Sequence, residues 1–345
     1  MLKLSLKRKF ISKTGIIIIL VGFLSFLLQT PQLNAESIVE KAKKEGKVTY
    51  YSSLRMYDHQ AVGDAFMKKY PFIKYEPRRV GSSSQSLEKC IMERQGGLRI
   101  ADVLQINGSD VNLFIKEGLL QKHISPEAKN WPKGFKDPEG YWTAYYSSNN
   151  CWIYNTKLVA AKDAPKSYED FLDPKWRGKI ALADSETEWY MGMMQFMGRE
   201  KALGYMKRLA DQIKIFNGKT LSMQLVAAGE FPIAKGILHR YLAMKKKGAP
   251  IQTVALPTPT LAGMRVIALH ADAPHPNAAK LFIDFMLSRE GQETLVDISY
   301  HPIRSDVKVD PVLEKVMQNW YGINPISAEE MAASMKEFQK VLLKR

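Results

Sequence analysis

Cysteine is scarce in this 345-residue chain, which contains only Cys90 and Cys151. The two residues lie far apart, no Cys-x-x-Cys pair occurs, and no spacing of cysteine and histidine is typical of a metal site. We therefore expect no resident metal or cofactor and two buried thiols, with a Cys90–Cys151 disulfide as the alternative in an oxidising compartment. The absence of a cysteine near residue 35 argues against a lipid-anchored lipoprotein.

The chain also lacks an arginine-rich arm and an aromatic-basic repeat, which argues against a nucleic-acid partner. Its formal net charge is +15, and about +10 remains once the five basic residues of the first 13 positions are set aside. The remaining basic residues are dispersed, for example over 41–47 and 245–247. We expect solvated helix faces and a modest attraction for anions.

Only one long apolar run is present, Gly15–Leu28, and it follows five basic residues between Lys3 and Lys13. Leu33-Asn34-Ala35 then places a small residue at a cleavage position, which is the pattern of a signal peptide. The run is short for a membrane span, although an uncleaved anchor is the alternative. We predict a signal peptide over residues 1–35, cleavage near Ala35 and an exported, periplasmic protein. The remaining ~310 residues suffice for two domains or one large one.

Strand, polar loop and helix recur three times between residues 47 and 117. The predicted strands are 48–51, 73–76 and 101–104, and polar loops follow them at 52–55, 81–84 and 107–110. We expect Asp58 to cap a helix that runs to Lys69. Such alternation predicts a parallel α/β sheet, in which ligands bind beyond the carboxyl ends of the strands.

The stretch 164–186 predicts a helix, a tight turn and a buried strand at Ile180–Leu182. Asp184 to Thr187 would then cap a helix near Trp189, leaving backbone N–H groups that face a crevice. Before this stretch, 141–154 predicts two extended segments with a polar interruption at 147–150. After it we expect a helix at 221–228, strands at 254–256 and 264–269, and a helical tail over 311–343.

The order of these elements resembles the periplasmic solute-binding proteins of ABC importers, and their ferric-ion-binding branch in particular. The resemblance covers 36–304 and rests most on the blocks Ala164–Leu182 and Ala273–Gln292. It implies a type II binding-protein fold: two α/β domains with mixed sheets joined by a two-strand hinge. The domains would be 36–146 with 264–345, and 147–263.

Ferric binders of this branch use a His, a Glu and a Tyr pair as ligands. The matching positions here hold Arg55, Asn107 and Leu238-His239. Because Fe³⁺ prefers anionic oxygen ligands, this set disfavours direct Fe³⁺ binding. Phenolates could still come from tyrosines elsewhere, namely Tyr50, Tyr57, Tyr145, Tyr146 and Tyr241.

An arginine after the first strand suits a carboxylate, phosphate or phosphonate. We therefore expect a small anionic solute, bound by hinge closure and delivered to an ABC permease by a monomeric protein. The alternatives are a ferric-ion or ferric-chelate receptor, and an exported transferase that uses Cys151, which lacks a nearby base. Each site residue also has a structural interpretation: the serines could only cap helices, and Arg55 could be a solvated loop residue. The predicted ligand-binding residues are Ser52, Ser53, Arg55, Ser82, Ser83, Asn107, Tyr146, Asp184, Ser185, Thr187, Thr220 and His239.

Overall fold

The computed structural model describes residues 37–129, 131, 134–256, 259–311, 313–314 and 319–344. The predicted signal peptide lies outside these residues. Ile38–Arg345 forms one compact unit. Within the described part of the chain, no helix combines the length and the apolar character that crossing a membrane requires.

Strands and helices alternate along the first third of the chain, as the sequence predicts. The strands carry buried Val, Tyr, Leu and Ile side chains, and the helices between them are amphipathic. These elements are α2 (Ile38–Glu45), β1 (Lys47–Ser52), α3 (Met56–Lys69), β2 (Lys74–Arg79), α4 (Ser83–Gln95), β3 (Val103–Asn107), the 3₁₀ turn η1 (Gly108–Asp110), α5 (Val111–Lys116), β4 (Leu120–Gln121) and η2 (Pro126–Ala128).

The same alternation continues after a long strand in the middle of the chain. The elements are β5 (Thr143–Asn155), η3 (Glu169–Leu172), η4 (Pro174–Trp176), β6 (Ile180–Ala183), α6 (Thr187–Met197), α7 (Arg199–Leu209), β7 (Ile213–Phe216), α8 (Lys219–Ala228), β8 (Ile233–Ile237), α9 (Leu238–Lys246), β9 (Ile251–Thr253), β10 (Thr260–His270), α10 (Pro276–Leu287), α11 (Arg289–Asp297), β11 (His301–Pro302), β12 (Trp320–Ile323), α13 (Ala328–Phe338) and the π turn η5 (Gln339–Leu343).

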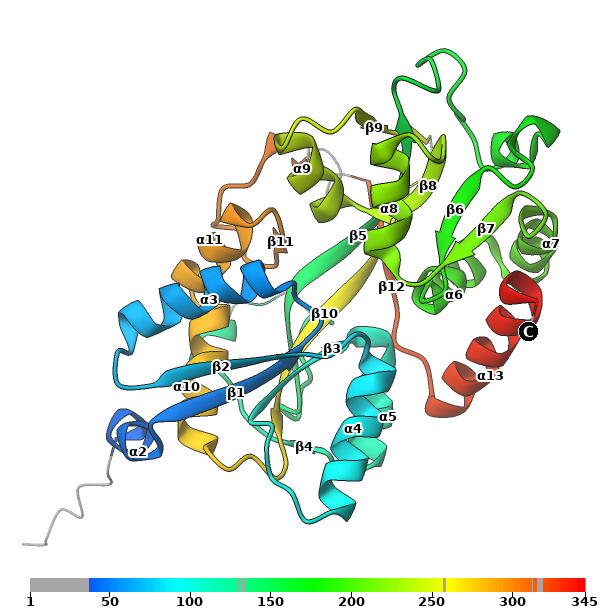
Figure 1. Ribbon diagram of the computed structural model, residues 1–345. Helices are drawn as coiled ribbons and strands as arrows, with labels where there is room; N and C mark the ends of the chain where they lie inside the picture. Colours follow the sequence, from blue (N-terminus) through cyan, green and yellow to red (C-terminus); the bar gives the residue numbers. More distant parts are fainter. Residues whose placement is uncertain are drawn as a thin grey trace, which may run out of the picture. The chain divides into compact units, whose positions relative to one another are not determined.

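The strands form a mixed sheet in the order β2-β1-β3-β10-β5-β8-β6-β7. β1, β2 and β3 are parallel, as are β6, β7 and β8, whereas β10 runs antiparallel to both β3 and β5. β5 pairs with β10 along its first part and with β8 from Asn150 to Tyr154. This strand therefore joins the β1–β3 half of the sheet to the β6–β8 half, and β10 lies beside it (Figure 1).

Helices cover both faces of each half. In the first half, α3, α10 and α11 pack over one aromatic-rich core, and α4 and α5 pack over another. In the second half, α6, α7 and η5 share a core with β6, while α8 and α9 share one with β8. The predicted α/β class with mixed sheets and the type II binding-protein architecture are therefore confirmed.

The prediction of two separate extended segments over 141–154 is wrong, because β5 continues through the polar residues. Ser147 pairs with Met264 and Asn149 with Ala262 across the ladder. Asn150 donates a hydrogen bond to the Leu261 carbonyl at 2.8 Å. Since neighbouring strands satisfy these polar groups, they do not interrupt the strand.

The predicted helix within 164–186 is also wrong, because η3 and η4 occupy this stretch. The Asp170 carboxylate accepts hydrogen bonds from the Lys166 and Ser167 N–H groups, at 2.7 and 3.2 Å, which folds the chain back on itself. Pro174 then disfavours helical backbone at Asp173, which caps η4 instead.

Three other boundaries differ from the prediction. Asp58 is the third residue of α3 rather than its cap, since the helix begins at Met56. The strand expected at 254–256 is β9, which ends at Thr253 after its last pair with β5. The tail is not wholly helical, because Trp320–Ile323 pairs with β10 as β12.

Both thiols are free, as the sequence favours. Cys90 is buried on α4 and Cys151 is half-buried on β5. Burial raises the pKa of each thiol to about 12, so both are protonated at neutral pH.

His301 makes the stability of the fold sensitive to acid. It is 4% exposed and shares a 2.7 Å hydrogen bond with Ser147 Oγ, and burial lowers its pKa to about 4. Above pH 6.5 the imidazole is neutral in both folded and unfolded chains. As the pH falls from 6.5 to 4 the unfolded chain binds the proton first, so stability is lost. We expect the native protein to lose about 3 kcal/mol more than His301→Asn between pH 7 and pH 4, measured by urea unfolding. Equal losses of stability in the native protein and in His301→Asn between pH 7 and pH 4 would contradict this.

Candidate functional site

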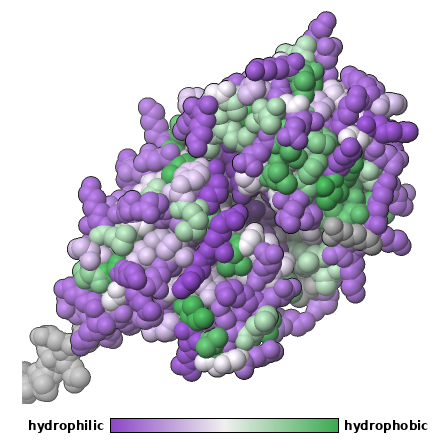
Figure 2. Space-filling view, in the orientation of Figure 1, coloured by the Kyte–Doolittle hydropathy of each residue, from purple (hydrophilic) through white to green (hydrophobic). Residues whose placement is uncertain are grey.

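A cavity of about 680 Å³ lies where the loops of both sheet halves converge. Figure 2 shows this face of the molecule hollowed between mostly hydrophilic residues. The carboxyl ends of β2, β3, β6 and β7 contribute Arg79, Asn107, Asp184 and Asn217 to its lining. This placement beyond the strand ends is typical of ligand sites in open α/β sheets.

Most of the predicted ligand-binding residues line this cavity. They come from loops as far apart in sequence as residues 53 and 239, so the fold brings them together. They are Ser53, Ser82, Ser83, Asn107, Tyr146, Asp184, Ser185, Thr187, Thr220 and His239. Their contact with a ligand remains a prediction.

Ser52 and Arg55 do not line the cavity. The Ser52 hydroxyl is buried and lies 3.0 Å from His59 Nε2. Arg55 is the N-cap of α3, and its guanidinium binds both carboxylate oxygens of Asp58, at 2.8 and 3.0 Å. It also lies over the Tyr57 ring, 4.1 Å from the centroid. The Asp58 carboxylate, on the same helix, therefore already compensates the charge of Arg55, the arginine that the sequence predicts to bind an anion.

Arg240, unlike Arg55, lines the cavity. It is the third residue of α9. One guanidinium nitrogen donates to Thr220 Oγ1 at 2.5 Å, whereas the buried Nε has no partner among the described residues. Burial lowers the pKa of Arg240, and the charges of Arg55 and Arg79 lower it further, although the guanidinium stays protonated.

Neither Arg240 nor Arg79 forms an ion pair with a carboxylate in the described part of the chain. Sequence reasoning missed both residues. Each stood beside a predicted site residue, since Arg79 precedes the 81–84 loop and Arg240 follows His239. Arg79 is exposed and Arg240 is half-buried. The partly buried Arg240 guanidinium costs free energy without a carboxylate partner, and an anion that binds it offsets this cost.

His239 closes one side of the cavity as a neutral group. Its ring stacks on Tyr300 with the centroids 4.2 Å apart and the planes 20° from parallel. Burial lowers its pKa well below the ordinary value, and the nearby charges of Arg240 and Arg55 add to this effect. Its Nδ1 is buried and has no partner among the described residues.

Two clusters of charged side chains at the cavity contain ion pairs. Arg265 of β10 binds Glu188 of α6 through two 2.8 Å hydrogen bonds. Glu186 pairs with buried Lys235 and with Lys219, the latter at 3.2 Å. The Arg265–Glu188 pair therefore connects β10, which lies beside β5, to α6 of the second half. Lys219 shares the Glu186 carboxylate with Lys235, whereas Arg79 and Arg240 have no carboxylate partner among the described residues.

Helix N-termini add further positive potential. α4 begins at Ser83 and α8 at Lys219, and the first residues of both helices line the cavity. The Ser82 hydroxyl accepts a hydrogen bond from Gln85 N–H at 3.2 Å, so this serine does act as a cap. The other first-turn N–H groups lack partners within their helices and can donate to an anion.

The residues lining the cavity do not suit Fe³⁺ as a substrate. Burial raises the pKa of Tyr146 to about 12 and that of Tyr300 well above its ordinary value, so both phenols are protonated at neutral pH. Both Glu188 oxygens bind Arg265, Asp110 accepts from Ser109 Oγ and Asn107 Nδ2, and Asp184 Oδ1 accepts from the Gly218 N–H. A hard trivalent cation would need free anionic oxygens here.

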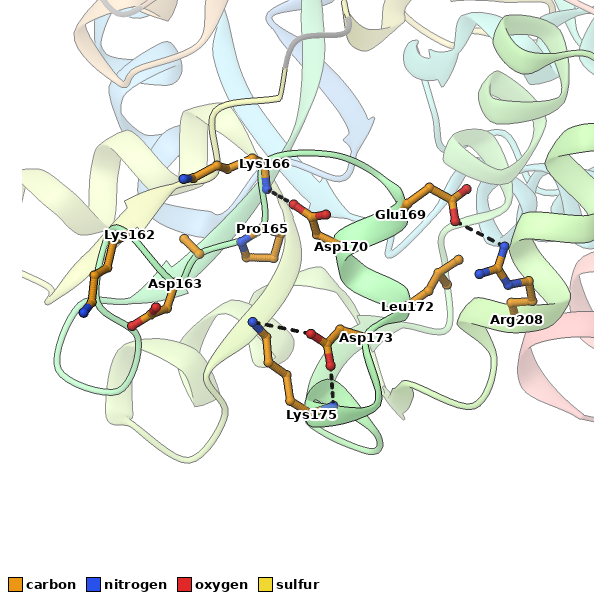
Figure 3. Close-up of a pocket in the computed structure, with 11 residues that line it drawn as sticks. Lys162, Asp163, Pro165, Lys166, Glu169, Asp170, Leu172, Asp173, Lys175 and Arg208 are labelled. Carbon is orange, nitrogen blue, oxygen red and sulfur yellow. Dashed lines mark hydrogen bonds and ion pairs between the residues drawn. The ribbon is translucent and has the colours of Figure 1, made fainter.

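A second hollow, of about 620 Å³, lies over the turns between β5 and β6 (Figure 3). Its charged side chains bind one another: Glu169 pairs with Arg208 at 3.2 Å, and Asp173 with Lys175 at 3.6 Å. Because these charges are already compensated and exposed, we assign the functional site to the first cavity.

Comparison with known proteins agrees with the fold. Residues 61–319 match the family model described as bacterial extracellular solute-binding protein. A Salmonella typhi protein named "Putative 2-aminoethylphosphonate-binding periplasmic protein" is 27% identical, over 86% of this chain and 93% of its own length.

Two solved structures share the fold. The periplasmic binding protein AfuA from Actinobacillus pleuropneumoniae, with fructose-6-phosphate bound, has a TM-score of 0.75 at 24% identity and covers 87% of this chain and 99% of its own. Iron-bound HitA from Pseudomonas aeruginosa has a TM-score of 0.73 at 22% identity and covers 86% of this chain and 99% of its own. With the match over residues 61–319 and a cavity at the carboxyl ends of two joined sheet halves, this chain belongs to the bacterial extracellular solute-binding protein family.

Proposed function

We propose that this protein binds a small solute carrying a phosphonate or phosphate group and delivers it to an ABC permease. The observation that carries the proposal is Arg240, a half-buried residue that lines the cavity and has no carboxylate partner among the described residues. Arg79 adds a second unpaired cation to the lining. Together they favour a ligand with two negative charges or several acceptor oxygens.

The geometry suits a tetrahedral anion better than a planar carboxylate. The N-termini of α4 and α8 and the arginine fork of Arg240 supply donors from three elements. A phosphonate or phosphate presents three terminal oxygens, so that each can take donors from a different element.

The relatives support the same class of ligand. The Salmonella protein is named for 2-aminoethylphosphonate, and AfuA was solved with fructose-6-phosphate. HitA carries iron, but Glu188 and Asp110 of this lining already accept hydrogen bonds from other side chains, which argues against this cargo here.

We propose that solute capture uses hinge closure about β5 and β10. The domains would be 36–146 with 264–345, and 147–263, and this division is supported by the pairing of Ser147 with Met264 at both boundaries. Solute would shift an open–closed equilibrium by contacting both sides. The tail beyond β12 contacts both halves, through Lys116–Glu329 and Arg199–Glu337.

The mature protein would act as a monomer in the periplasm after cleavage near Ala35. The basic and apolar pattern of residues 1–35 supports export, and the relatives of the family named above are periplasmic.

Isothermal titration calorimetry tests the function with four probes: phenylphosphonate, 2-aminoethylphosphonate, inorganic phosphate and ferric citrate. Protein purified through an unfolding and refolding step, to remove carried-over solute, should bind at least one phosphonate with a dissociation constant at or below about 10 μM. Binding of ferric citrate alone, with phenolate absorbance in the visible range, would contradict the proposal.

We further propose that the protein acts by binding alone, so Cys151 has no catalytic part. This thiol does not line the cavity, and its raised pKa keeps it protonated. Cys151→Ala should leave phenylphosphonate affinity within about twofold of the native value by calorimetry. Cys90→Ala serves as the matched control. A loss of affinity in Cys151→Ala alone would contradict the proposal that Cys151 takes no part in the function.

A further inference from the structure

One wall of the cavity is apolar and comes from the C-terminal helix. Met331, Met335 and Phe338 of α13 line the cavity, as does Leu343 of η5. The spacing of the three α13 residues, four and three positions apart, places their side chains on one face of the helix. Among the lining residues of this segment only Gln339 is polar.

α13 is fixed at both ends, so this face is part of the site rather than a loose tail. Glu329 pairs with Lys116 of α5 at 2.9 Å, and Glu337 pairs with Arg199 of α7 at 2.8 Å. Phe338 packs on Tyr190 of α6, with ring centroids 5.7 Å apart. In Figure 1 the helix lies between α5 and α7, from which these partners come.

The rest of the lining differs from the α13 face. Arg79, Arg240 and the N-termini of α4 and α8 supply charge and N–H donors, whereas α13 supplies thioether and hydrocarbon surface. A cavity of about 680 Å³ is also far larger than a bare phosphate requires. A sugar ring placed against α13 would leave hydroxyl groups without partners, which is costly.

We infer that the solute is an organic phosphonate or phosphate ester with an apolar, preferably aromatic, carbon group, and that Met335 selects this group, with the buried Met331 and Phe338 packed on either side of it along the helix. The inference rests on the proposed function, since the arginines must hold the anionic end. Methionine side chains suit this role because they are flexible, polarisable and favourable against aromatic rings. The helix lies outside the matched family residues 61–319, so it adds to the site a wall that the family match does not include.

Calorimetry with phenylphosphonate, 2-aminoethylphosphonate and inorganic phosphate tests the inference. We expect the native protein to bind phenylphosphonate at least about tenfold more tightly than either of the others. Met335→Gln should weaken phenylphosphonate binding about fivefold or more and leave inorganic phosphate within about twofold. Met335 is half-buried, so this change removes no core side chain. Met92→Gln, at a 71% exposed position on α4, is the matched control and should change neither.

The outcomes distinguish failure of this inference from failure of the proposed function. Equal affinity for the three phosphorus anions in the native protein would overturn the inference and leave the proposed function standing. An equal loss for every probe in Met335→Gln would also overturn it. Absence of binding to any phosphonate or phosphate would overturn both. The comparison of probes on the native protein does not depend on the folding of any variant.

Discussion

Arg240→Gln should weaken phenylphosphonate binding by about 100-fold, because it removes a partly buried, charge-assisted donor whose carboxylate partner is absent from the described residues. Hydrogen bonds to charged groups contribute about 1.5–3 kcal/mol in proteins, and a 100-fold loss lies at the upper end of this range. Isothermal titration calorimetry measures the loss directly.

The conservative variant sharpens this prediction. Arg240→Lys keeps the charge but loses the planar fork, so we expect an intermediate loss of about tenfold. Arg208→Gln is the matched control, because Arg208 is exposed and pairs only with Glu169 at the surface. The stability of ligand-free Arg240→Gln should equal or exceed that of the native protein, since a partly buried cation without a carboxylate partner opposes folding. Native affinity in Arg240→Gln would show that the anion binds elsewhere.

Glu188→Leu should destabilise the fold by about 3–5 kcal/mol. The change would leave the buried Arg265 guanidinium without the carboxylate that binds it through two 2.8 Å hydrogen bonds. Burial opposes ionisation of Glu188, but Arg265 outweighs it and holds the pKa of the carboxyl below its ordinary value. The pair is therefore fully charged at neutral pH. Urea unfolding of ligand-free protein measures the effect.

A double variant tests whether the cost comes from the orphaned charge. Glu188→Leu/Arg265→Leu removes both charges and should recover most of the stability lost in the single variant. Gly263 supports this reading, since a Cβ there would lie 2.2 Å from Glu188 Oε1, which means that the backbone leaves space for the carboxylate. A double variant as unstable as Glu188→Leu would indicate that shape, rather than charge, sets the cost.

The sequence predicts the sheet class, most elements and the loops that line the cavity, because these depend on local patterns. The helix expected at 221–228 is α8, which ends at Ala228 as predicted because Gly229 adopts the left-handed conformation that terminates a helix. β12 escaped prediction because its partner in β10 lies some 60 residues earlier in the chain, and only that pairing makes 320–323 a strand.

The arginine of the proposed anion site could not be predicted from local sequence patterns either. Arg55 and Arg240 are both arginines next to a strand end, and composition does not distinguish them. Asp58, three residues after Arg55, neutralises it within one helical turn. Arg240 has only the Thr220 hydroxyl, which lies on another helix. The wall from α13 depends on long-range packing, so no local pattern at Met331 or Met335 could place it at the cavity.

The continuity of β5 limits how this protein can be divided. Thr143 to Asn149 belong to the ladder with β10, and Asn150 to Asn155 to the ladders with β8 and β9. A cut between residues 146 and 147 would therefore pass through a hydrogen-bonded strand and expose an unpaired edge in each fragment. Neither half can therefore be produced alone with all of β5 paired as it is in the whole chain. Gene fusions or split reporters should accordingly be joined at surface loops away from β5, such as the exposed turns that precede β6.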